Sequence, residues 1–257
     1  MKNNEELKLA VIIDADNVPS SNVKGMMEEI AKYGTPTFKR IYGDWTKPNL
    51  SGWKSVLLEN AITPVQQYGY TSGKNSTDSA MIIDAMDILY TGKVDGFCII
   101  SSDSDFTKLA TRLRESGMKV FGFGQKKTPN PFIVACDKFI YIEILKSTET
   151  NHDEISTAEN EPKITSKNDA VDSIEKIDSE IVSLISSTVD DLADEDGWAF
   201  LGEVGNLIIK KRPDFDARNY GFDKLSKLIK SLSDNFEIDE RTTDKATIKL
   251  VYIRIKK

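Results

Sequence analysis

Two hydrophobic runs in this sequence end abruptly in acidic residues. The run at 9–13 is followed by Asp14, and the run at 96–100 is followed closely by Asp103 and Asp105. Short apolar runs of this kind predict strands of a buried parallel sheet, and open α/β folds bind their ligands at the carboxyl ends of such strands. We therefore expect a cluster of carboxylates at one edge of a parallel sheet.

A third segment supplies a further carboxylate. Asp78 is expected at the start of the helix that precedes the second of these strands, whereas Asp84, six residues later, falls nearly on the opposite helical face. Single aspartates in such places are often caps or turn formers, and Asp105 could simply begin the next helix. What favours a site is the convergence of four acids on one edge: Asp14, Asp78, Asp103 and Asp105.

Such a cluster favours metal-dependent chemistry. Carboxylates about 4 Å apart repel by about 4 kcal/mol per pair at an effective dielectric of about 20, so they are tolerable mainly with a cation between them. Ligand oxygens without histidine or cysteine select Mg²⁺ or Mn²⁺ rather than zinc. Two such ions would activate a water and stabilise the leaving oxygen of a phosphodiester.

The other reactive side chains argue against different mechanisms. The single histidine, His152, lies among polar residues of a linker-like segment, which disfavours histidine-dependent nucleophilic catalysis. Cys98 and Cys136 sit inside apolar runs and are expected to be buried and reduced. Two thiols and this histidine cannot make a zinc site of four protein ligands.

Polar and aromatic residues near the acids are candidates for substrate contact. Ser101 and Ser102 either contact substrate or only finish the strand, and Asn17 either caps the next helix or holds a metal or phosphate. An exposed indole at Trp45 could stack on an unpaired base, whereas Trp53 is expected to pack a helix. The basic residues that could contact phosphate are Lys39, Arg40, Lys47, Lys54, Lys74, Lys126 and Lys127.

Together these segments resemble the NYN family, PIN-like nucleases that include the LabA-like bacterial proteins. The resemblance covers about residues 8–145 and rests on VIIDADN at 11–17, KNSTD at 74–78 and ISSDSDF at 100–106. It implies a Mg²⁺- or Mn²⁺-dependent ribonuclease, with the four acids on the family's metal-binding positions and Asn17 on its usual asparagine. Lys74, four residues before Asp78, is then our first choice for orienting the phosphate.

The elements that must position these residues alternate between strand and helix. Six strands are predicted, at 8–14, 37–43, 62–67, 96–101, 118–123 and 139–143. Four helices are predicted, at 23–33, 53–60, 78–90 and 105–116. Ser20 or Ser21 is expected to cap the first helix and Thr77 the third, and three glycines are expected to close helices: Gly34, Gly92 and Gly117. This order predicts an α/β fold with a parallel sheet covered on both faces, and the resemblance implies its PIN-like form.

Charge and composition divide the chain into parts. The net charge is −7, yet residues 147–196 hold fifteen acids against three lysines, which leaves the remainder mildly basic. A nucleic-acid partner is therefore not excluded. Residues 147–173 lack periodicity and predict a flexible acidic linker between a domain at 1–146 and a smaller one at 174–257.

The smaller domain is predicted to be a winged helix-turn-helix. Apolar spacing places one helix from Ile174 to Leu192, with further helices at 201–210 and 223–232 and strands at 236–239 and 247–255. Its segments at 200–207, 211–215 and 220–225 resemble the LOTUS (OST-HTH) family, a winged-helix module associated with RNA and often joined to NYN domains. Residues on the family's typical positions are Gly205, Pro213, Phe215, Tyr220, Gly221 and Leu225.

A basic face is expected on this smaller domain. It comprises Lys210, Lys211, Arg212, Arg218, Lys224, Lys227 and Lys230. Such a face either contacts RNA or is the solvated surface of a protein-binding module.

The whole sequence predicts a metal-dependent ribonuclease with a C-terminal RNA-binding module. RNA, single-stranded or structured, is the expected partner, and the C-terminal domain could instead take a protein; the oligomeric state is left open, a homodimer included. The lack of a signal-like N-terminus and of an apolar run of roughly 20 residues predicts a cytoplasmic protein without a membrane segment.

Two rivals to this prediction stand. One is a non-catalytic adaptor that binds RNA or protein through a degenerate site. The other is a haloacid-dehalogenase-like phosphatase, because DADNV at 14–18 fits that family's nucleophile pattern of Asp-x-Asp-x-Val. The acids at 103–105 do not resemble the later acidic motif of those phosphatases, which makes this the weaker rival.

Overall fold

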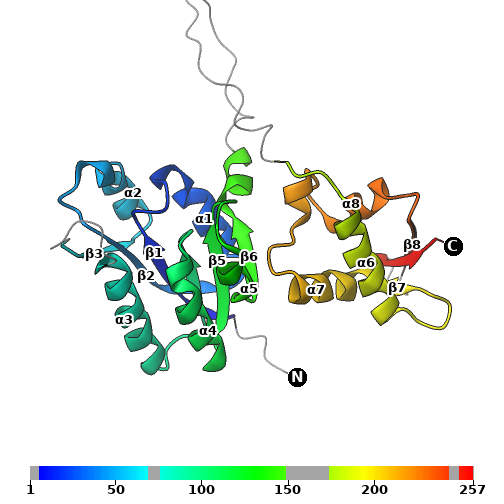
Figure 1. Ribbon diagram of the computed structural model, residues 1–257, viewed down its shortest axis with the longest axis horizontal. Coiled ribbons are helices and arrows are strands. Elements are labelled where there is room, and N and C mark those ends of the chain that lie inside the picture. Colours follow the sequence, from blue (N-terminus) through cyan, green and yellow to red (C-terminus); the bar gives the residue numbers. More distant parts are fainter. Residues whose placement is uncertain (1–5, 69–75, 149–173, 243–248, 257) are drawn as a thin grey trace, which may run out of the picture. The chain divides into compact units, whose positions relative to one another are not determined.

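The computed structural model describes residues 6–68, 76–148, 174–242 and 249–256 (Figure 1). The chain forms two compact units, divided between residues 154 and 155. The division falls inside segment 149–173, which lies outside the described residues together with His152, so the domain limits and the linker stay predictions. Within the described residues, no helix has the length and apolar character needed to cross a membrane.

The first unit is built on a parallel sheet of six strands in the order β3-β2-β1-β4-β5-β6, which confirms the predicted α/β fold. The strands are β1 (Lys8–Asp14), β2 (Thr35–Gly43), β3 (Thr63–Gln66), β4 (Gly96–Ile100), β5 (Lys119–Gly124) and β6 (Lys138–Tyr141). The helices are α1 (Val23–Ile30), α2 (Trp53–Glu59), α3 (Ser76–Tyr90), α4 (Thr107–Glu115) and α5 (Asn130–Val134).

Helices cover both faces of this sheet (Figure 1). On one face α1 and α2 pack against alternate β1 residues, with Met26 and Trp53 in contact with a cluster that includes Val11. On the other face α3, α4 and α5 pack against the intervening β1 residues, such as Ile12. Both faces of β1 and β4 are therefore buried, which explains why their sequences are apolar without alternation.

The strand order reverses direction between β1 and β4. From β1 the chain builds outward to β2 and β3, and then it returns to build β4, β5 and β6 on the other side of β1. Connections leave β1 and β4 toward opposite sides, so a crevice opens at their carboxyl ends, where ligands bind in sheets of this type.

Some local predictions were wrong. A 3-10 turn at Ser20–Asn22 precedes α1, and no side chain caps that helix; α3 begins before Thr77. Gly92 and Gly117 end helices with positive φ angles of 64° and 83°, as predicted. Gly34 is needed for a different reason, because a Cβ there would lie 2.2 Å from the carbonyl oxygen of Leu7.

The second unit contains three helices and a small antiparallel sheet, as expected for a winged helix-turn-helix. Its elements are α6 (Ser179–Leu192), β7 (Ala199–Phe200), α7 (Leu201–Lys211), α8 (Leu225–Ser231), β8 (Phe236–Thr242) and β9 (Lys249–Ile255), with strand order β7-β9-β8. The first helix is shorter than predicted. Asp178 accepts a hydrogen bond from the Ile181 amide and begins the helix there, which leaves Ile174 outside and 56% exposed.

Candidate metal centre

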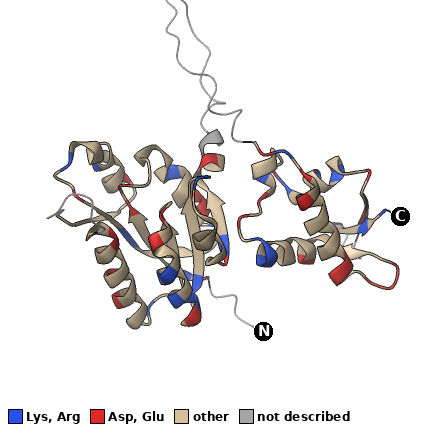
Figure 2. Cartoon of the chain, viewed as in Figure 1, with Lys and Arg blue, Asp and Glu red and all other residues tan. Residues whose placement is uncertain are grey.

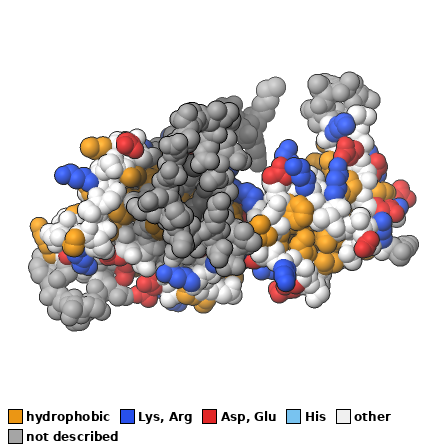
Figure 3. All heavy atoms as spheres, turned by 90° about the horizontal axis from the view of Figure 1, so that it is seen from above, with side chains coloured by type: hydrophobic (Ala, Val, Ile, Leu, Met, Phe, Trp, Pro, Cys, Tyr) orange, Lys and Arg blue, Asp and Glu red, His pale blue; other side chains and the backbone are white. Residues whose placement is uncertain are grey.

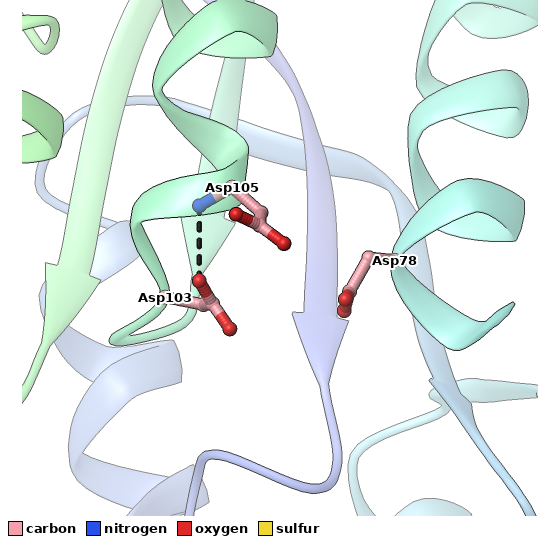
Figure 4. A group of neighbouring side chains, drawn as sticks. All are labelled: Asp78, Asp103 and Asp105. Atoms are coloured by element: carbon pink, nitrogen blue, oxygen red, sulfur yellow. Dashed lines mark hydrogen bonds between the residues drawn. The ribbon is translucent and has the colours of Figure 1, made fainter. Parts of the chain in front are cut away.

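Three elements bring acids to the crevice beyond β1 and β4. Asp14 is the last residue of β1, and Asp78 lies in the first turn of α3. Asp103 and Asp105 belong to the turn that follows β4, where a short 3-10 segment at Ser104–Phe106 leads into α4. Figure 4 shows three of these carboxylates turned toward one another, from α3 and from this turn.

Asp78, Asp103 and Asp105 form the acidic triad. One oxygen of each lies within 4.8 Å of one oxygen of each of the others. Asp103 also caps the turn, since its Oδ1 accepts a hydrogen bond of 2.9 Å from the backbone amide of Asp105. That bond fixes both side chains on one short loop. The capping acid is thus Asp103, not Asp105 as the sequence favoured.

Asp78 is a triad member whose pKa is raised by its surroundings. Burial, followed by the charges of Asp14, Asp103, Asp105 and Asp16, raises the pKa of Asp78 from 3.8 to about 6. A divalent ion bound between these carboxylates would offset their mutual repulsion, so the arrangement favours a cation. Three carboxylate oxygens with neither sulfur nor imidazole are the ligands of Mg²⁺ or Mn²⁺, so these residues fit such an ion.

Asp14 lies apart from the triad and is held differently. Its side chain is 1% exposed. Oδ1 accepts from the Asp16 amide at 3.1 Å, and Oδ2 accepts from Asn17 Nδ2 at 2.6 Å and from Ser101 Oγ at 2.8 Å. Burial raises the pKa of Asp14 in spite of these donors. Its charge nevertheless reaches the triad, because it is the first of the neighbouring acids that raise the pKa of Asp78.

Two of the predicted contact residues at this edge, Asn17 and Ser101, make hydrogen bonds to the acidic residues. Asn17 neither caps α1 nor lies free; it donates to Asp14. Ser101, fully buried, bridges Asp14 and the backbone amide of Asp103, while Ser102 accepts from the Gln125 amide. Ser101 is fully buried in these contacts, and substrate contact by either serine stays a prediction.

The aromatic and basic candidates differ in burial and in their hydrogen-bond or ion-pair partners. Trp53 is buried as expected, and Trp45 is half-buried, with its indole N–H donating to the Val65 carbonyl at 3.1 Å, which does not match an exposed stacking surface. Arg40 pairs with Asp84. Lys74 lies outside the described residues, so its role stays a prediction.

Two other lysines lie in the loop after β5. Lys127 is exposed, whereas Lys126 is half-buried and its amide donates to Glu143. The sequence prediction missed Gln125 in this loop, although its position just after a strand, at the carboxyl edge of the sheet, was a usable signal.

The comparison with known families agrees with this geometry. The family model for the NYN domain matches residues 8–143, more than half of the chain. The chain belongs to the NYN domain family. This domain places it in the PIN-like nuclease superfamily, and the acidic triad lies inside the matched region.

A second family model, the OST-HTH/LOTUS domain, matches residues 172–246. The NYN domain and the LOTUS domain together indicate a function connected with RNA.

Solved structures add little. A crystal structure of a protein of unknown function from Vibrio parahaemolyticus is 20% identical, covers 55% of this chain and 96% of its own, and has a TM-score of 0.46. A solution NMR structure of an uncharacterised protein from Nitrosomonas europaea is 30% identical over 40% of this chain and 91% of its own, with a TM-score of 0.29. The search of curated proteins found no match.

The burial of Asp14 also bears on the phosphatase alternative. That mechanism needs the first acid of DADNV, Asp14, as an exposed nucleophile. Both of its oxygens are occupied by donors, and its side chain is almost inaccessible. Together with the NYN match, this excludes Asp14 as a phosphoryl acceptor in this conformation.

Acidic residues lie among the basic residues of the LOTUS domain (Figure 2). Five of the seven predicted members of its basic face pair with acids: Lys211, Arg212, Arg218, Lys227 and Lys230. Lys210 and Lys224 make no ion pair with a described residue. Described residues 174–242 and 249–256 carry sixteen acidic and twelve basic side chains, so this part of the unit is not a strongly basic surface.

Proposed function

We propose that the protein is a metal-dependent ribonuclease that hydrolyses RNA phosphodiester bonds at the acidic triad. The observation that carries this proposal is the convergence of three carboxylates from α3 and the turn after β4 at the crevice of an NYN domain. Gathering them is costly without a cation, because burial and the charges of the neighbouring acids together raise the pKa of Asp78 to about 6.

Each residue has a distinct task in this proposal. Asp78, Asp103 and Asp105 hold the divalent cation, Mg²⁺ or Mn²⁺. Asp14 keeps a fixed negative charge behind them, and Ser101 and Asn17 hold that carboxylate in place. When bound, the cation lowers the pKa of a water and neutralises charge that develops on the phosphate. The water oxygen would bond to phosphorus as the water gives up a proton to solvent, and the bond from phosphorus to the ribose oxygen would break as that oxygen takes a proton from solvent.

The test is cleavage of labelled single-stranded and structured RNA by wild type and by Asp103→Asn, with Mn²⁺, Mg²⁺ or a chelator. Asparagine still offers an oxygen to the Asp105 amide, so the turn is expected to fold. We expect Asp103→Asn to lose activity by at least about a hundredfold, comparable with removing one electrostatic group from other active sites.

The matched control is Asp87→Asn, an exposed aspartate of α3 outside the triad, which should keep full activity. Cleavage that survives both Asp103→Asn and the chelator would contradict the proposal. RNA binding without cleavage under every metal condition would instead favour the non-catalytic adaptor.

A further inference from the structure

A pocket lies beside Asp14, at the same carboxyl edge of the sheet as the acidic triad but toward α1 and α2. Residues 15–21, Asn49, Leu50, Trp53, Gln125 and Lys127 line it, and its volume is about 450 Å³. We call it the flanking pocket. It is formed by the loops after β1, β2 and β5, so three strand ends of the parallel sheet build it.

Hydrogen bonds join the flanking pocket to the metal centre. Asn17 lines the pocket and donates to Asp14 at 2.6 Å. Asp14 in turn accepts from Ser101, whose oxygen accepts from the Asp103 amide at 3.1 Å. On the far wall the Gln125 amide donates to Ser102 at 2.8 Å. The pocket wall is therefore two hydrogen-bonded residues away from a triad member.

The lining of the flanking pocket has a specific chemistry. Three apolar side chains belong to the lining, Val18, Leu50 and Trp53, and only their edges, each less than 5% exposed, reach its surface. Its rim carries side-chain amides and hydroxyls: Asn17, Ser20, Ser21, Asn49 and Gln125. Amides offer both a donor and an acceptor, and hydroxyls offer either.

This combination fits one class of ligand better than others. A phosphate site would gather cations, but among the described lining residues Lys127 is the sole basic one, and the lining also holds the acid Asp16. A purely apolar ligand would leave the amides unpaired. An unpaired nucleobase has apolar faces and an edge of donors and acceptors, and proteins recognise single-stranded RNA by seating such bases and bonding their edges. The volume is in the range of pockets that hold one small ligand.

We propose that the flanking pocket takes one unpaired RNA base next to the phosphodiester bond held at the acidic triad. Lys127, at its exposed rim, then contacts a phosphate of the same strand. This inference rests on the proposed nuclease function and adds to it a base-binding subsite beside the cut. A base-paired nucleotide must first leave its helix, which costs a few kcal/mol and selects against duplex RNA.

The first test is catalytic and uses the full-length protein. A single-stranded RNA of fixed sequence has one nucleotide at a time replaced by an abasic unit. We expect the bond next to the abasic unit on one side to be cut at least about tenfold more slowly, while more distant bonds are cut as before.

Asn49→Ala and Gln125→Ala should lower kcat/KM for the intact RNA about tenfold and reduce the differences in cleavage rate among the four bases. The matched control is Asn130→Ala, an exposed amide outside the pocket.

The second test needs no catalysis. In chelator, the side-chain amide signals of Asn49 and Gln125 are followed by NMR while a mixed hexanucleotide, or its fully abasic counterpart, is added. The intact strand should shift these two signals and the abasic strand should not, with the Asn130 signal unmoved by either. If both strands act alike, or if the two variants match the control, the flanking pocket does not take a base. Failure of cleavage together with base-dependent shifts would overturn the nuclease proposal and leave the pocket assignment standing.

Discussion

Asp78 is the acid of the triad that folding makes hardest to ionise. The triad gathers three carboxylates and Asp14 lies behind them, and burial and this negative field together raise the pKa of Asp78 to about 6. A site that favours a cation is, without the cation, a source of instability. The free-energy cost of ionising Asp78 in the folded protein can therefore be measured with a substitution at this one side chain.

Asp78→Asn is therefore expected to stabilise the metal-free protein at neutral pH. The folded carboxyl binds its proton more tightly than the unfolded one, so the penalty appears as pH rises from about 4 to about 6 and is complete above that range. A shift of this size corresponds to at most about 3 kcal/mol, and solvent screening of a partly exposed group reduces it to about 1 kcal/mol at pH 7.5. Thermal unfolding in chelator from pH 4 to pH 8 measures it.

The control for this prediction is the metal itself. Added Mn²⁺ should stabilise wild type more than Asp78→Asn, because only wild type keeps all three ligands. A variant that is less stable than wild type in chelator at pH 7.5 would contradict the assigned cause of the raised pKa.

Ser101 is a second residue whose role can be measured. Its hydroxyl is the bridge between Asp14 and the Asp103 amide. Ser101→Ala removes one donor from a buried carboxylate, which should lower the free energy of unfolding by about 1 to 3 kcal/mol. Because partners behind metal ligands tune affinity, Mn²⁺ binding by calorimetry should weaken by about 10- to 100-fold. Ser104→Ala, an exposed serine in the same turn, should change neither quantity.

At the scale of elements, the position of α3 decides where Asp78 lies. Asp84, in the middle of α3, accepts hydrogen bonds from Arg40 and from the buried hydroxyl-bearing Tyr42 of β2. Burial and this carboxylate raise the pKa of Tyr42 above its usual value. These hydrogen bonds join the middle of α3 to β2. They help to set the position of the helix, whose first turn lies at the crevice.

Asp84→Ala is expected to lower the free energy of unfolding by about 2 to 3 kcal/mol, because it leaves the Tyr42 hydroxyl and Arg40 without their acceptor. Metal affinity should fall too, since the first turn of α3 loses its anchor. Chemical denaturation and Mn²⁺ titration give the two values. Asp87→Ala, on the exposed side of the same helix, serves as the reference, and an equal loss in both variants would remove the special role of Asp84.

Helices and strands could be predicted from the sequence more fully than the hydrogen bonds between distant side chains. Fully buried strands such as β1 and β4 have clear apolar runs, and the acidic segment after β4 located two of the three triad members, Asp103 and Asp105. The five-residue α5, with Pro129 as its N-cap residue and Pro131 in its first turn, and the two-residue β7 are too short for periodicity to reveal. The function of Ser101 depends on a contact with Asp14, 87 residues away, which no local pattern encodes.

At the scale of the whole molecule, charge is divided unequally between the units. The LOTUS domain was predicted to present a basic face, but acids pair with most of its members. On the side shown in Figure 3, hydrophobic side chains gather on this unit between charged ones. We therefore expect few phosphate contacts from this domain and a larger electrostatic contribution from the lysines of the NYN domain.

The salt dependence of RNA binding tests this division in the full-length protein. Each phosphate contact on a single strand contributes about −0.7 to the slope of log affinity against log salt. Lys127→Gln, at the rim of the flanking pocket, should make that slope less steep by about 0.7. Lys210→Gln and Lys224→Gln, the two members of the basic face without an ion pair among the described residues, should leave it within error. Binding is measured by anisotropy in chelator from 50 to 300 mM salt. A larger change for the LOTUS lysines than for Lys127 would place the main phosphate contacts in the second unit, because the slope counts charges neutralised and is insensitive to apolar contact.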